Sequence, residues 1–299
     1  MSTAHNGQIL VTGGNGQLAT SLAKLGGARI DRVGRPEFDF EKPDTIEAVL
    51  DAHRPAAVVN AAAWTAVDLA ETEQAGAEAA NCTGPALLAA ACAKRNIPFI
   101  HVSTDYVFAG DKGSPYVETD PVSPQTVYGS TKADGERKVL AADPRAIILR
   151  TSWVYSSHGK NFVRTMINAG AKNPALKVVG DQRGNPTNSD DLAEAILAIV
   201  GLIERDGWKD AYAGLYHACG TGEATWHELA VAALEEAARH GQKMPEVTAI
   251  RTEDWPTPAK RPADSRMDNG KLAHVFGVKM PEWRQSVTRT VKELFSQAG

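Results

Sequence analysis

The feature that most restricts the fold of this chain is a glycine-rich turn after its first apolar run. Residues 8–12 (QILVT) are apolar enough for a buried parallel strand, and residues 18–25 then have helical spacing. Between these segments Gly13, Gly16 and Ala19 recur at three-residue intervals. Glycines at a strand-to-helix turn let the backbone approach a pyrophosphate, whose charge the helix N-terminus stabilises. The turn therefore predicts a dinucleotide site, although tight turns also use glycine for shape alone.

Apolar runs and helical segments continue to alternate through the first half of the chain. Strands are expected at residues 29–33, 56–60, 98–103 and 146–151, and helices at residues 45–53, 73–94 and 127–141. The helix over residues 73–94 is expected to break or bend near Gly84 and Pro85, because proline disrupts a helix interior. Repeated strand–helix units predict a parallel sheet covered on both faces. We expect an α/β fold, namely a Rossmann-type doubly wound parallel sheet.

The second half of the chain has a different pattern, in which the predicted helices and strands are shorter and loops are more frequent. Helices are expected at residues 161–171, 190–203 and 225–239, and strands at residues 176–179 and 214–218. We expect residues 1–155 to form the dinucleotide-binding domain, with about 188–219 packing back onto it. Residues 156–187 and 220–299 are expected to form a smaller, discontinuous C-terminal substrate domain. The ligand cleft is expected between the two domains.

Composition restricts the class of protein. The chain has 299 residues, of which 43% are hydrophobic and 23% charged, as in ordinary soluble domains. The formal net charge of −4 gives no electrostatic case for nucleic acid or an anionic membrane as the main partner. No apolar run reaches the roughly 18 residues that a membrane span needs. Residues 1–7 do not resemble an export signal, so the expected location is the cytoplasm.

The cysteines and histidines predict no metal site and no disulfide framework. Cys82, Cys92 and Cys219 have no zinc-type spacing, and the first two lie in an alanine-rich helical stretch as buried hydrophobes would. The eight histidines also lack the spacing of a metal site.

A tyrosine and a lysine four residues apart carry the chemistry of the prediction. Tyr128 and Lys132 share one face of the helix expected over residues 127–141. Free tyrosine titrates near pH ~10, and a nearby ammonium with a positive nicotinamide ring would stabilise the phenolate. Lowering the pKa to about 7 takes roughly 4 kcal/mol. The pair predicts a nicotinamide-dependent oxidoreductase that acts on a carbonyl or an alcohol.

Two hydroxyl residues end the strand expected over residues 98–103. Ser103 and Thr104 lie where an open α/β sheet presents side chains to its ligand. A hydroxyl there would hydrogen-bond the substrate carbonyl and stabilise a developing alkoxide. We predict this role for Thr104 ahead of Ser103, the alternative being a plain strand end.

The end of the second strand bears on cofactor choice. Asp31 falls inside or at the end of that strand, whereas Gly34 and Arg35 occupy the strand-end position. Arg32 and Arg35 favour the 2′-phosphate of NADPH, unless both are solvated surface arginines. NADPH is therefore predicted over NADH, and NADH stays open.

Five segments make the chain resemble the dTDP-4-dehydrorhamnose reductases, a family of extended short-chain dehydrogenase/reductases. They are TGGNGQL at 12–18, NAAAWTAVD at 60–68, STDYVF at 103–108, YGSTK at 128–132 and RTSWVY at 150–155. The likeness continues at residues 181–187, 214–217 and 256–262, and so spans nearly the whole chain. The STDYVF and RTSWVY segments are more specific than the glycine turn.

The resemblance implies an activity and a set of site residues. The activity is the NADPH-dependent reduction of the 4-keto group of dTDP-4-dehydro-L-rhamnose to dTDP-L-rhamnose, with Tyr128 as proton donor. The implied catalytic residues are Thr104, Tyr128 and Lys132. The expected cofactor-binding residues are Gly13, Asn15, Gly16, Gln17, Leu18, Arg35, Asp39, Phe40, Ala61, Ala62, Ala63, Trp64, Thr65, Val102, Tyr128 and Lys132. The expected substrate-binding residues are Thr104, Asp105, Tyr128 and Trp153.

Several alternatives stay open at this point. The same scaffold serves NAD-retaining nucleotide-sugar epimerases, and a non-catalytic regulatory subunit would also keep the fold. Some relatives form a dimer bridged by Mg²⁺ through glutamates, but the matching positions here are Ser21 and Asp190, so one carboxylate is missing and a homodimer stays open. Trp153 would stack on a sugar face or pack in the core. A basic cluster of Lys260, Arg261 and Arg266 would hold a pyrophosphate or be a solvated loop.

Overall fold

The structure, a computed structural model, describes residues 7–297, and a parallel sheet lies at its centre. Within these residues six strands pair in the order β10-β5-β4-β3-β1-β2, all in parallel. The strands are β1 (Ile9–Thr12), β2 (Ile30–Val33), β3 (Ala57–Asn60), β4 (Phe99–Thr104), β5 (Ile147–Thr151) and β10 (Gly214–His217). The strand order reverses beside β1, where doubly wound sheets place their ligands. The predicted α/β fold is confirmed.

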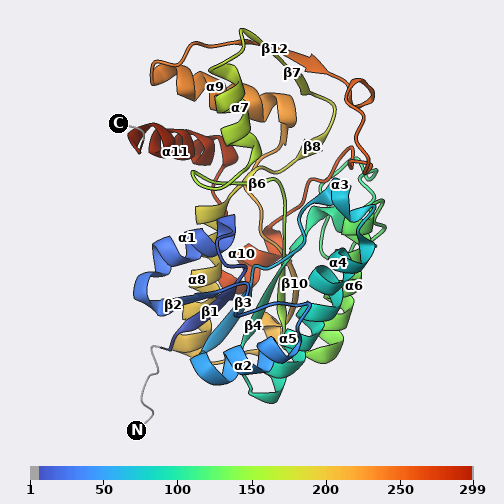
Figure 1. Cartoon of the computed structure of the whole chain (residues 1–299), viewed down its shortest axis with the longest axis vertical. Helices are drawn as coiled ribbons and strands as arrows, with labels where there is room; N and C mark the ends of the chain where they lie inside the picture. Colours follow the sequence, from blue (N-terminus) through green and yellow to red (C-terminus); the bar gives the residue numbers. More distant parts are fainter. Residues whose placement is uncertain (1–6, 298–299) are drawn as a thin grey trace.

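Alternate residues of each strand face two different helix layers. In β1, Ile9 and Val11 pack with α1 (Gln17–Gly26) and α8 (Ser189–Asp206). Leu10 points the other way, into the core shared with α2 (Asp44–His53), α5 (Gly84–Lys94) and α6 (Val127–Ala142). Helices therefore cover both faces of the sheet, which explains the uninterrupted apolar runs of its strands (Figure 1).

The helix predicted over residues 73–94 departs from α geometry where a break was expected. It consists of α4 (Gln74–Glu78), a π-helical segment (Ala79–Thr83) and α5. Pro85 lies in the first turn of α5, where its missing N–H costs least. The wider π turn absorbs the disturbance just before the proline, and the helix continues instead of ending.

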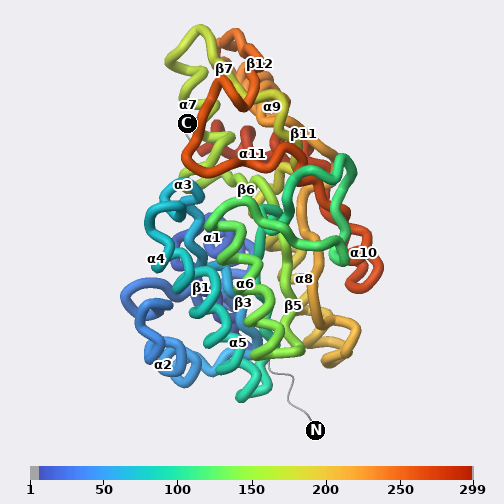
Figure 2. The backbone as a smooth tube through the Cα atoms, turned by 90° about the vertical axis from the view of Figure 1, so that its right-hand side faces the viewer, coloured from blue at the N-terminus to red at the C-terminus, as the bar shows by residue number. Residues whose placement is uncertain are grey.

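A second group of elements lies beyond the carboxyl ends of the sheet strands. It contains α7 (Phe162–Gly170), α9 (Trp226–Arg239), α11 (Trp283–Ser296) and the parallel pair β7 (Ala175–Val179) with β12 (Glu246–Ile250). These segments are far apart in the sequence but lie together above the sheet in Figures 1 and 2. They share their own core, which includes Tyr155, Val163, Leu229 and Trp283. This group of elements therefore has a hydrophobic core distinct from those of the sheet.

The precise division stays a prediction. As expected, α8 packs against α1 and so belongs with the sheet. Helix α10 (Gly270–Phe276), in contrast, was assigned to the substrate domain, yet Leu272 and Phe276 pack in the core of the sheet. The remaining elements are α3 (Val67–Ala70), β6 (Val154–Tyr155), β8 (Arg183–Gly184), β9 (Thr187–Asn188), β11 (Ala224–Thr225) and 3₁₀ turns at Gly27–Arg29, Asp105–Val107, Asp210–Tyr212 and Thr252–Asp254.

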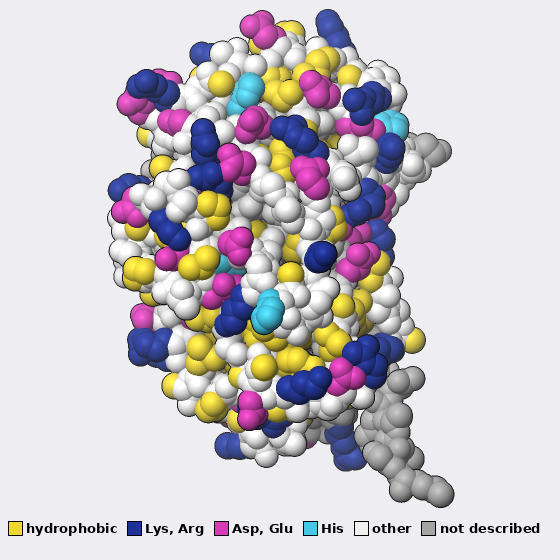
Figure 3. Space-filling view, turned by 180° about the vertical axis from the view of Figure 1, so that it is seen from behind, with side chains coloured by type: hydrophobic (Ala, Val, Ile, Leu, Met, Phe, Trp, Pro, Cys, Tyr) yellow, Lys and Arg dark blue, Asp and Glu magenta, His cyan; other side chains and the backbone are white. Residues whose placement is uncertain are grey.

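The surface shows no preference for one sign of charge on the face seen in Figure 3. Lysines and arginines are interspersed there with aspartates and glutamates. Among residues 7–297, no helix has both the length and the apolar character needed to cross a bilayer.

Candidate active site

A cleft of about 1070 Å³ opens at the carboxyl ends of the central strands. Every residue expected to be catalytic, cofactor-binding or substrate-binding from the family resemblance lines it. From the glycine turn and β2 these are Gly13, Asn15, Gly16, Gln17, Leu18, Arg35, Asp39 and Phe40. From the segments after β3 and β4 they are Ala61, Ala62, Ala63, Trp64, Thr65, Val102, Thr104 and Asp105, and from α6 and beyond Tyr128, Lys132 and Trp153. The fold thus gathers all the predicted site residues around one space.

The glycine turn provides the cradle that a dinucleotide needs. Gly13 has φ of 103°, and a Cβ atom there would lie 2.9 Å from the Ala61 carbonyl oxygen. The turn therefore passes close to the end of β3 only because it has no side chain. Helix α1 begins at Gln17 directly behind it and directs its free N–H groups toward the cleft. These residues fit a pyrophosphate.

Of the charged residues near the end of β2 that could contact the cofactor ribose or its 2′-phosphate, only some face the cleft. Arg35 lines the cleft, and its Nε lies 3.2 Å from the Asp39 carboxylate. The Asp31 carboxylate instead contacts His53 at 3.3 Å, and the Arg32 guanidinium lies 3.4 Å from the Thr20 hydroxyl. Asp31 and Arg32 are therefore turned to other partners, and Arg35 is the candidate that reaches the cleft.

The wall after β3 is held by the π-helical segment. The Asn81 side chain accepts from the Trp64 N–H at 2.8 Å and donates to the Trp64 carbonyl at 3.1 Å. It also donates to the Thr131 hydroxyl on α6 at 3.2 Å. One buried amide thus ties the wall of the cleft to the helix that carries Tyr128 and Lys132.

Tyr128 is brought to Thr104 by close packing of α6 on the turn after β4. A Cβ atom at Gly129 would lie 2.2 Å from the Tyr106 carbonyl oxygen, so glycine permits this contact. Burial raises the pKa of Tyr128 to about 12, and a hydrogen bond with Thr104 opposes that rise. From the sequence we predicted that the Lys132 ammonium and a positive nicotinamide ring would together lower this pKa. The structure instead makes Tyr128 a protonated phenol at neutral pH.

Lys132 lines the cleft but is only 1% exposed. Its ammonium donates to the Val102 carbonyl at 2.6 Å and lies 3.4 Å from His101 Nε2. Burial lowers the pKa of Lys132 to about 8, and the Glu136 carboxylate opposes this shift. Lys132 therefore titrates much closer to neutrality than an exposed lysine does.

Three buried polar groups in the cleft lack a partner. Asp105 is 2% exposed, and its Oδ1 accepts from the Thr104 hydroxyl at 3.0 Å. Among the described residues, Asp105 Oδ2, Ser103 Oγ and Thr151 Oγ1 have no hydrogen-bond partner. Burial raises the pKa of Asp105 to about 6. Such groups are costly unless a ligand satisfies them, so they point to a polar ligand.

Trp153 belongs to an aromatic stack that the sequence did not reveal. Its ring lies 3.7 Å from that of Trp226, with an interplanar angle of 7°. Trp226 is the first residue of α9, which begins with a capping box formed by Thr225 and Glu228. Trp226 and Lys160 also line the cleft, although no local motif marks them. Trp153 thus both packs against a partner and faces the ligand space.

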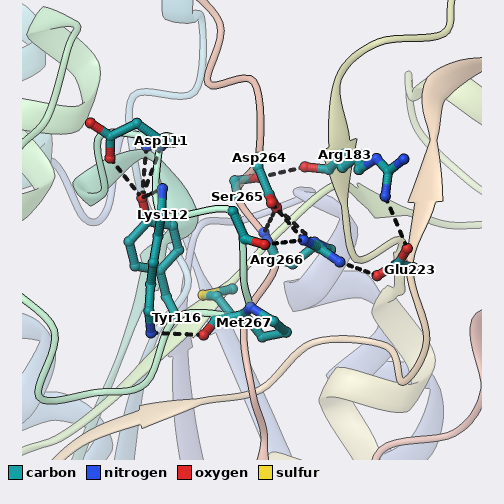
Figure 4. Close-up of polar contacts among 12 residues, drawn as sticks. Asp111, Lys112, Tyr116, Arg183, Glu223, Asp264, Ser265, Arg266 and Met267 are labelled. Atoms are coloured by element: carbon teal, nitrogen blue, oxygen red, sulfur yellow. Dashed lines mark hydrogen bonds and ion pairs between the residues drawn. The ribbon is translucent and has the colours of Figure 1, made fainter.

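The basic cluster near residue 260 is engaged elsewhere. Figure 4 shows Arg266 between Asp264 and Glu223, with a distance of 2.7 Å to the Asp264 carboxylate. The Arg261 guanidinium lies 2.8 Å from the Asp68 carboxylate. Both arginines are therefore paired with carboxylates and lie outside the lining of the cleft, as Lys260 does.

The positions matched to a metal-bridged dimer are also occupied by other contacts. The Ser21 hydroxyl lies 2.7 Å from that of Ser189, and Lys24 pairs with Asp190 at 2.8 Å. In the part of the chain that the structure describes, no group of three or more His, Cys, Asp or Glu side chains could hold a metal ion.

Comparison with known proteins agrees with this site. The family model described as the RmlD substrate binding domain matches residues 7–296. The dTDP-4-dehydrorhamnose reductase of Aggregatibacter actinomycetemcomitans is 40% identical over 286 residues, which cover 94% of this chain and 97% of that one. The crystal structure of a dTDP-4-dehydrorhamnose reductase from Clostridium acetobutylicum has a TM-score of 0.86 at 36% identity, covering 96% of this chain and 99% of that one. A Bacillus anthracis dTDP-4-dehydrorhamnose reductase in complex with NADP has a TM-score of 0.87 at 30% identity, with the same coverage. The chain therefore belongs to the RmlD substrate binding domain family.

Proposed function

We propose that this protein catalyses the NADPH-dependent reduction of the 4-keto group of dTDP-4-dehydro-L-rhamnose to dTDP-L-rhamnose. The observation that carries the proposal is the convergence of the glycine cradle, Tyr128 and Thr104 on one cleft. The relatives from Aggregatibacter and Clostridium bear the name of this activity, and the relative from Bacillus anthracis binds NADP.

The side chains take distinct roles in this proposal. NADPH held at the glycine turn of Gly13 and Gly16 would supply the hydride for carbon 4 of the sugar. Tyr128, held as a phenol by burial, donates its proton to the carbonyl oxygen. Thr104 holds that oxygen in line, and the unpartnered Asp105 oxygen accepts from a sugar hydroxyl. Lys132 binds the nicotinamide ribose and returns a proton to Tyr128.

The side chains at the end of β2 favour NADPH over NADH as the cofactor. Arg35 is the basic side chain there that lines the cleft, whereas the acid that would bind a free ribose, Asp31, is paired with His53. A guanidinium suits the 2′-phosphate of NADPH and has no counterpart in NADH.

Loss of NADPH absorbance on addition of dTDP-4-dehydro-L-rhamnose is the direct test. The substitution Tyr128→Phe removes only the hydroxyl and should lower kcat at least about 100-fold. The matched control is Tyr212→Phe, since Tyr212 is buried in the sheet core away from the cleft. Undiminished turnover in Tyr128→Phe would overturn the assigned mechanism. NAD that stays bound through purification and turnover would favour an epimerase instead.

We infer further that Mg²⁺ does not bridge two copies of this chain. The ammonium of Lys24 already lies between the carboxylates of Asp190 and Glu293, at 2.8 and 2.7 Å. A cation bound at the same place would meet this positive charge. Size-exclusion chromatography should therefore give one elution volume with and without a chelator, and a chelator-dependent change in assembly would contradict the inference.

A further inference from the structure

A row of three polar side chains crosses the centre of the sheet. Thr12 on β1 pairs in register with Asn60 on β3, which pairs with His101 on β4. All three side chains are fully buried. The row ends at Lys132, whose Nζ lies 3.4 Å from His101 Nε2. None of the roles assigned so far uses His101, although it touches a residue of the site.

Hydrogen bonds fix how the Asn60 amide is turned. Asn60 Oδ1 accepts from the Thr12 hydroxyl at 2.5 Å and from the Ala62 backbone N–H at 3.2 Å. The first distance suits an O–H···O bond, and a backbone N–H only donates. The atom that faces Thr12 and Ala62 is therefore the amide oxygen, and the amide nitrogen faces His101.

The orientation of Asn60 in turn decides which nitrogen of His101 carries the proton. Asn60 Nδ2 lies 2.8 Å from His101 Nδ1 and has only protons to offer. His101 Nδ1 must accept, so a neutral imidazole carries its proton on Nε2. Burial holds the pKa of His101 well below its usual range, which keeps the ring neutral. The Nε2–H therefore points at the nitrogen of Lys132.

An N–H and an ammonium facing each other are two donors without an acceptor. A neutral amine has a lone pair that accepts the Nε2–H, whereas the ammonium form has none. We propose that His101 is a positioning residue for the reaction, which favours the neutral form of Lys132 and so lets Lys132 release a proton to Tyr128. This proposal rests on the proposed function. Once the Tyr128 phenol has given its proton to the sugar oxygen, the Lys132 ammonium passes one proton to the phenolate and takes another from solvent.

Among the other groups around Lys132, one stabilises its ammonium form and so opposes the effect of His101. The Glu136 carboxylate, on the same helix, stabilises the ammonium, but it also binds Arg150 at 2.7 Å. The Val102 carbonyl accepts from Nζ in either form of the lysine. Tyr128 is a neutral phenol. His101 is therefore the neighbour that opposes the ammonium, together with burial itself.

The tautomer of His101 is measured in the wild-type protein, without any substrate. Long-range ¹H–¹⁵N NMR spectra of protein labelled in histidine distinguish a proton on Nε2 from one on Nδ1, and the ring signals of His101 are assigned from its backbone resonances in the wild-type protein. We expect the Nε2–H form. A proton on Nδ1 would overturn the proposal, and this measurement stands even where the variant folds poorly.

The effect on Lys132 is measured with His101→Phe, which keeps a ring of similar size and removes the N–H. The Lys132 pKa, followed by ¹³C NMR of labelled lysine, should rise by about half a unit to one unit. The pH at which kcat falls on the basic side of its profile should rise by a similar amount. An unchanged or lower Lys132 pKa would show that His101 is only a core residue. His53→Gln, a change at a histidine that ends α2 and contacts Asp31 and Glu37, is the control and should leave the Lys132 pKa unchanged.

The two proposals fail in different ways. A protein that reduces no 4-keto sugar but shows the Nε2–H tautomer and the shifted Lys132 pKa would refute the proposed function alone. A working reductase with a proton on His101 Nδ1 would refute the role of His101 alone.

Discussion

At the scale of single residues, burial sets the protonation state of the cleft. It raises the pKa of Asp105 to about 6 and that of Tyr128 to about 12, and it lowers that of Lys132 to about 8. All three shifts favour the neutral form. A reductase needs this for Tyr128, because a phenolate has no proton to give. The same desolvation makes the ionised carboxylate of Asp105 destabilise the folded protein.

The substitution Asp105→Asn should therefore stabilise the protein while it impairs function. Because the folded pKa of Asp105 is raised from 3.8 to about 6, folding becomes less favourable as the pH rises between these values, a loss of about 3 kcal/mol. Asparagine does not ionise, so the variant should be more stable by about 1–3 kcal/mol above pH ~6, and the gain should vanish below pH ~4. Denaturant titrations over this pH range measure it. A gain that persists in acid would assign the effect to packing instead.

Arg35 should govern the choice between the two nicotinamide cofactors. Replacing its guanidinium in Arg35→Met removes the partner of the 2′-phosphate, which should raise the KM for NADPH about 10-fold and leave that for NADH unchanged. Arg32→Met is the matched control, because Arg32 contacts Thr20 and lies outside the cleft lining. Equal losses with both cofactors would show that Arg35 binds a part they share.

Local sequence predicted these residues because their chemistry depends on short spacings. Tyr128 and Lys132 lie one helical turn apart, and Thr104 ends a strand, so each was found from its own neighbours. Trp226 had no such signal, since only the fold brings it against Trp153. The protonation states were also out of reach, because the burial that sets them comes from residues distant in the sequence.

At the scale of elements, one buried ion pair fixes α6 on β5. Arg150 Nε and Nη2 donate to the two oxygens of Glu136 at 2.9 and 2.7 Å, and both side chains are almost fully buried. Glu136 lies one turn beyond Lys132 on α6, and Arg150 lies on β5. Its geometry therefore sets how α6 presents its catalytic face to the end of the sheet.

Glu136→Gln should destabilise the protein by about 3–5 kcal/mol, because it leaves the Arg150 charge buried without its counter-ion. It should also lower the Lys132 pKa further, since the Glu136 carboxylate is the group that raises it. Thermal unfolding and a Lys132 titration measure the two effects. The double variant Glu136→Gln with Arg150→Met should regain most of the lost stability. If the double variant is no more stable than the single one, the pair acts by packing and not by charge.

Strands with a continuous run of apolar residues could be predicted from the sequence. Strands without such a run could not. Strands β1, β3 and β5 of the sheet are fully buried and were found near their observed bounds. Strand β12 (Glu246–Ile250) has no buried residue and pairs with β7, some seventy positions earlier, so no local pattern predicted it. The two-residue strands β8 and β9 were not among the predicted elements, since a pairing so short leaves no periodicity.

At the scale of the whole molecule, the two groups of elements meet at the Trp153–Trp226 stack. Trp153 follows β5 of the sheet, and Trp226 begins α9 of the upper group. The Trp226 indole also donates to Gln182 at 3.1 Å, which anchors it in the upper group. The stack therefore forms a wall of the cleft to which both groups contribute. A sugar bound against Trp153 would depend on Trp226 to hold that ring in place.

Trp226→Ala should for this reason weaken substrate binding without affecting the cofactor. We expect the KM for the nucleotide sugar to rise about 10-fold or more, since a stacked aromatic pair contributes about 0.5–1.5 kcal/mol beyond its buried area and Trp153 would lose its orientation. The Kd of NADPH should stay the same, because the cradle at Gly13 belongs to the sheet. Trp255→Ala is the control, since that indole is 61% exposed and lies outside the cleft lining. A parallel loss of NADPH affinity would mean that the upper group positions the cofactor as well. The assignment of cofactor binding to the sheet alone would then be wrong.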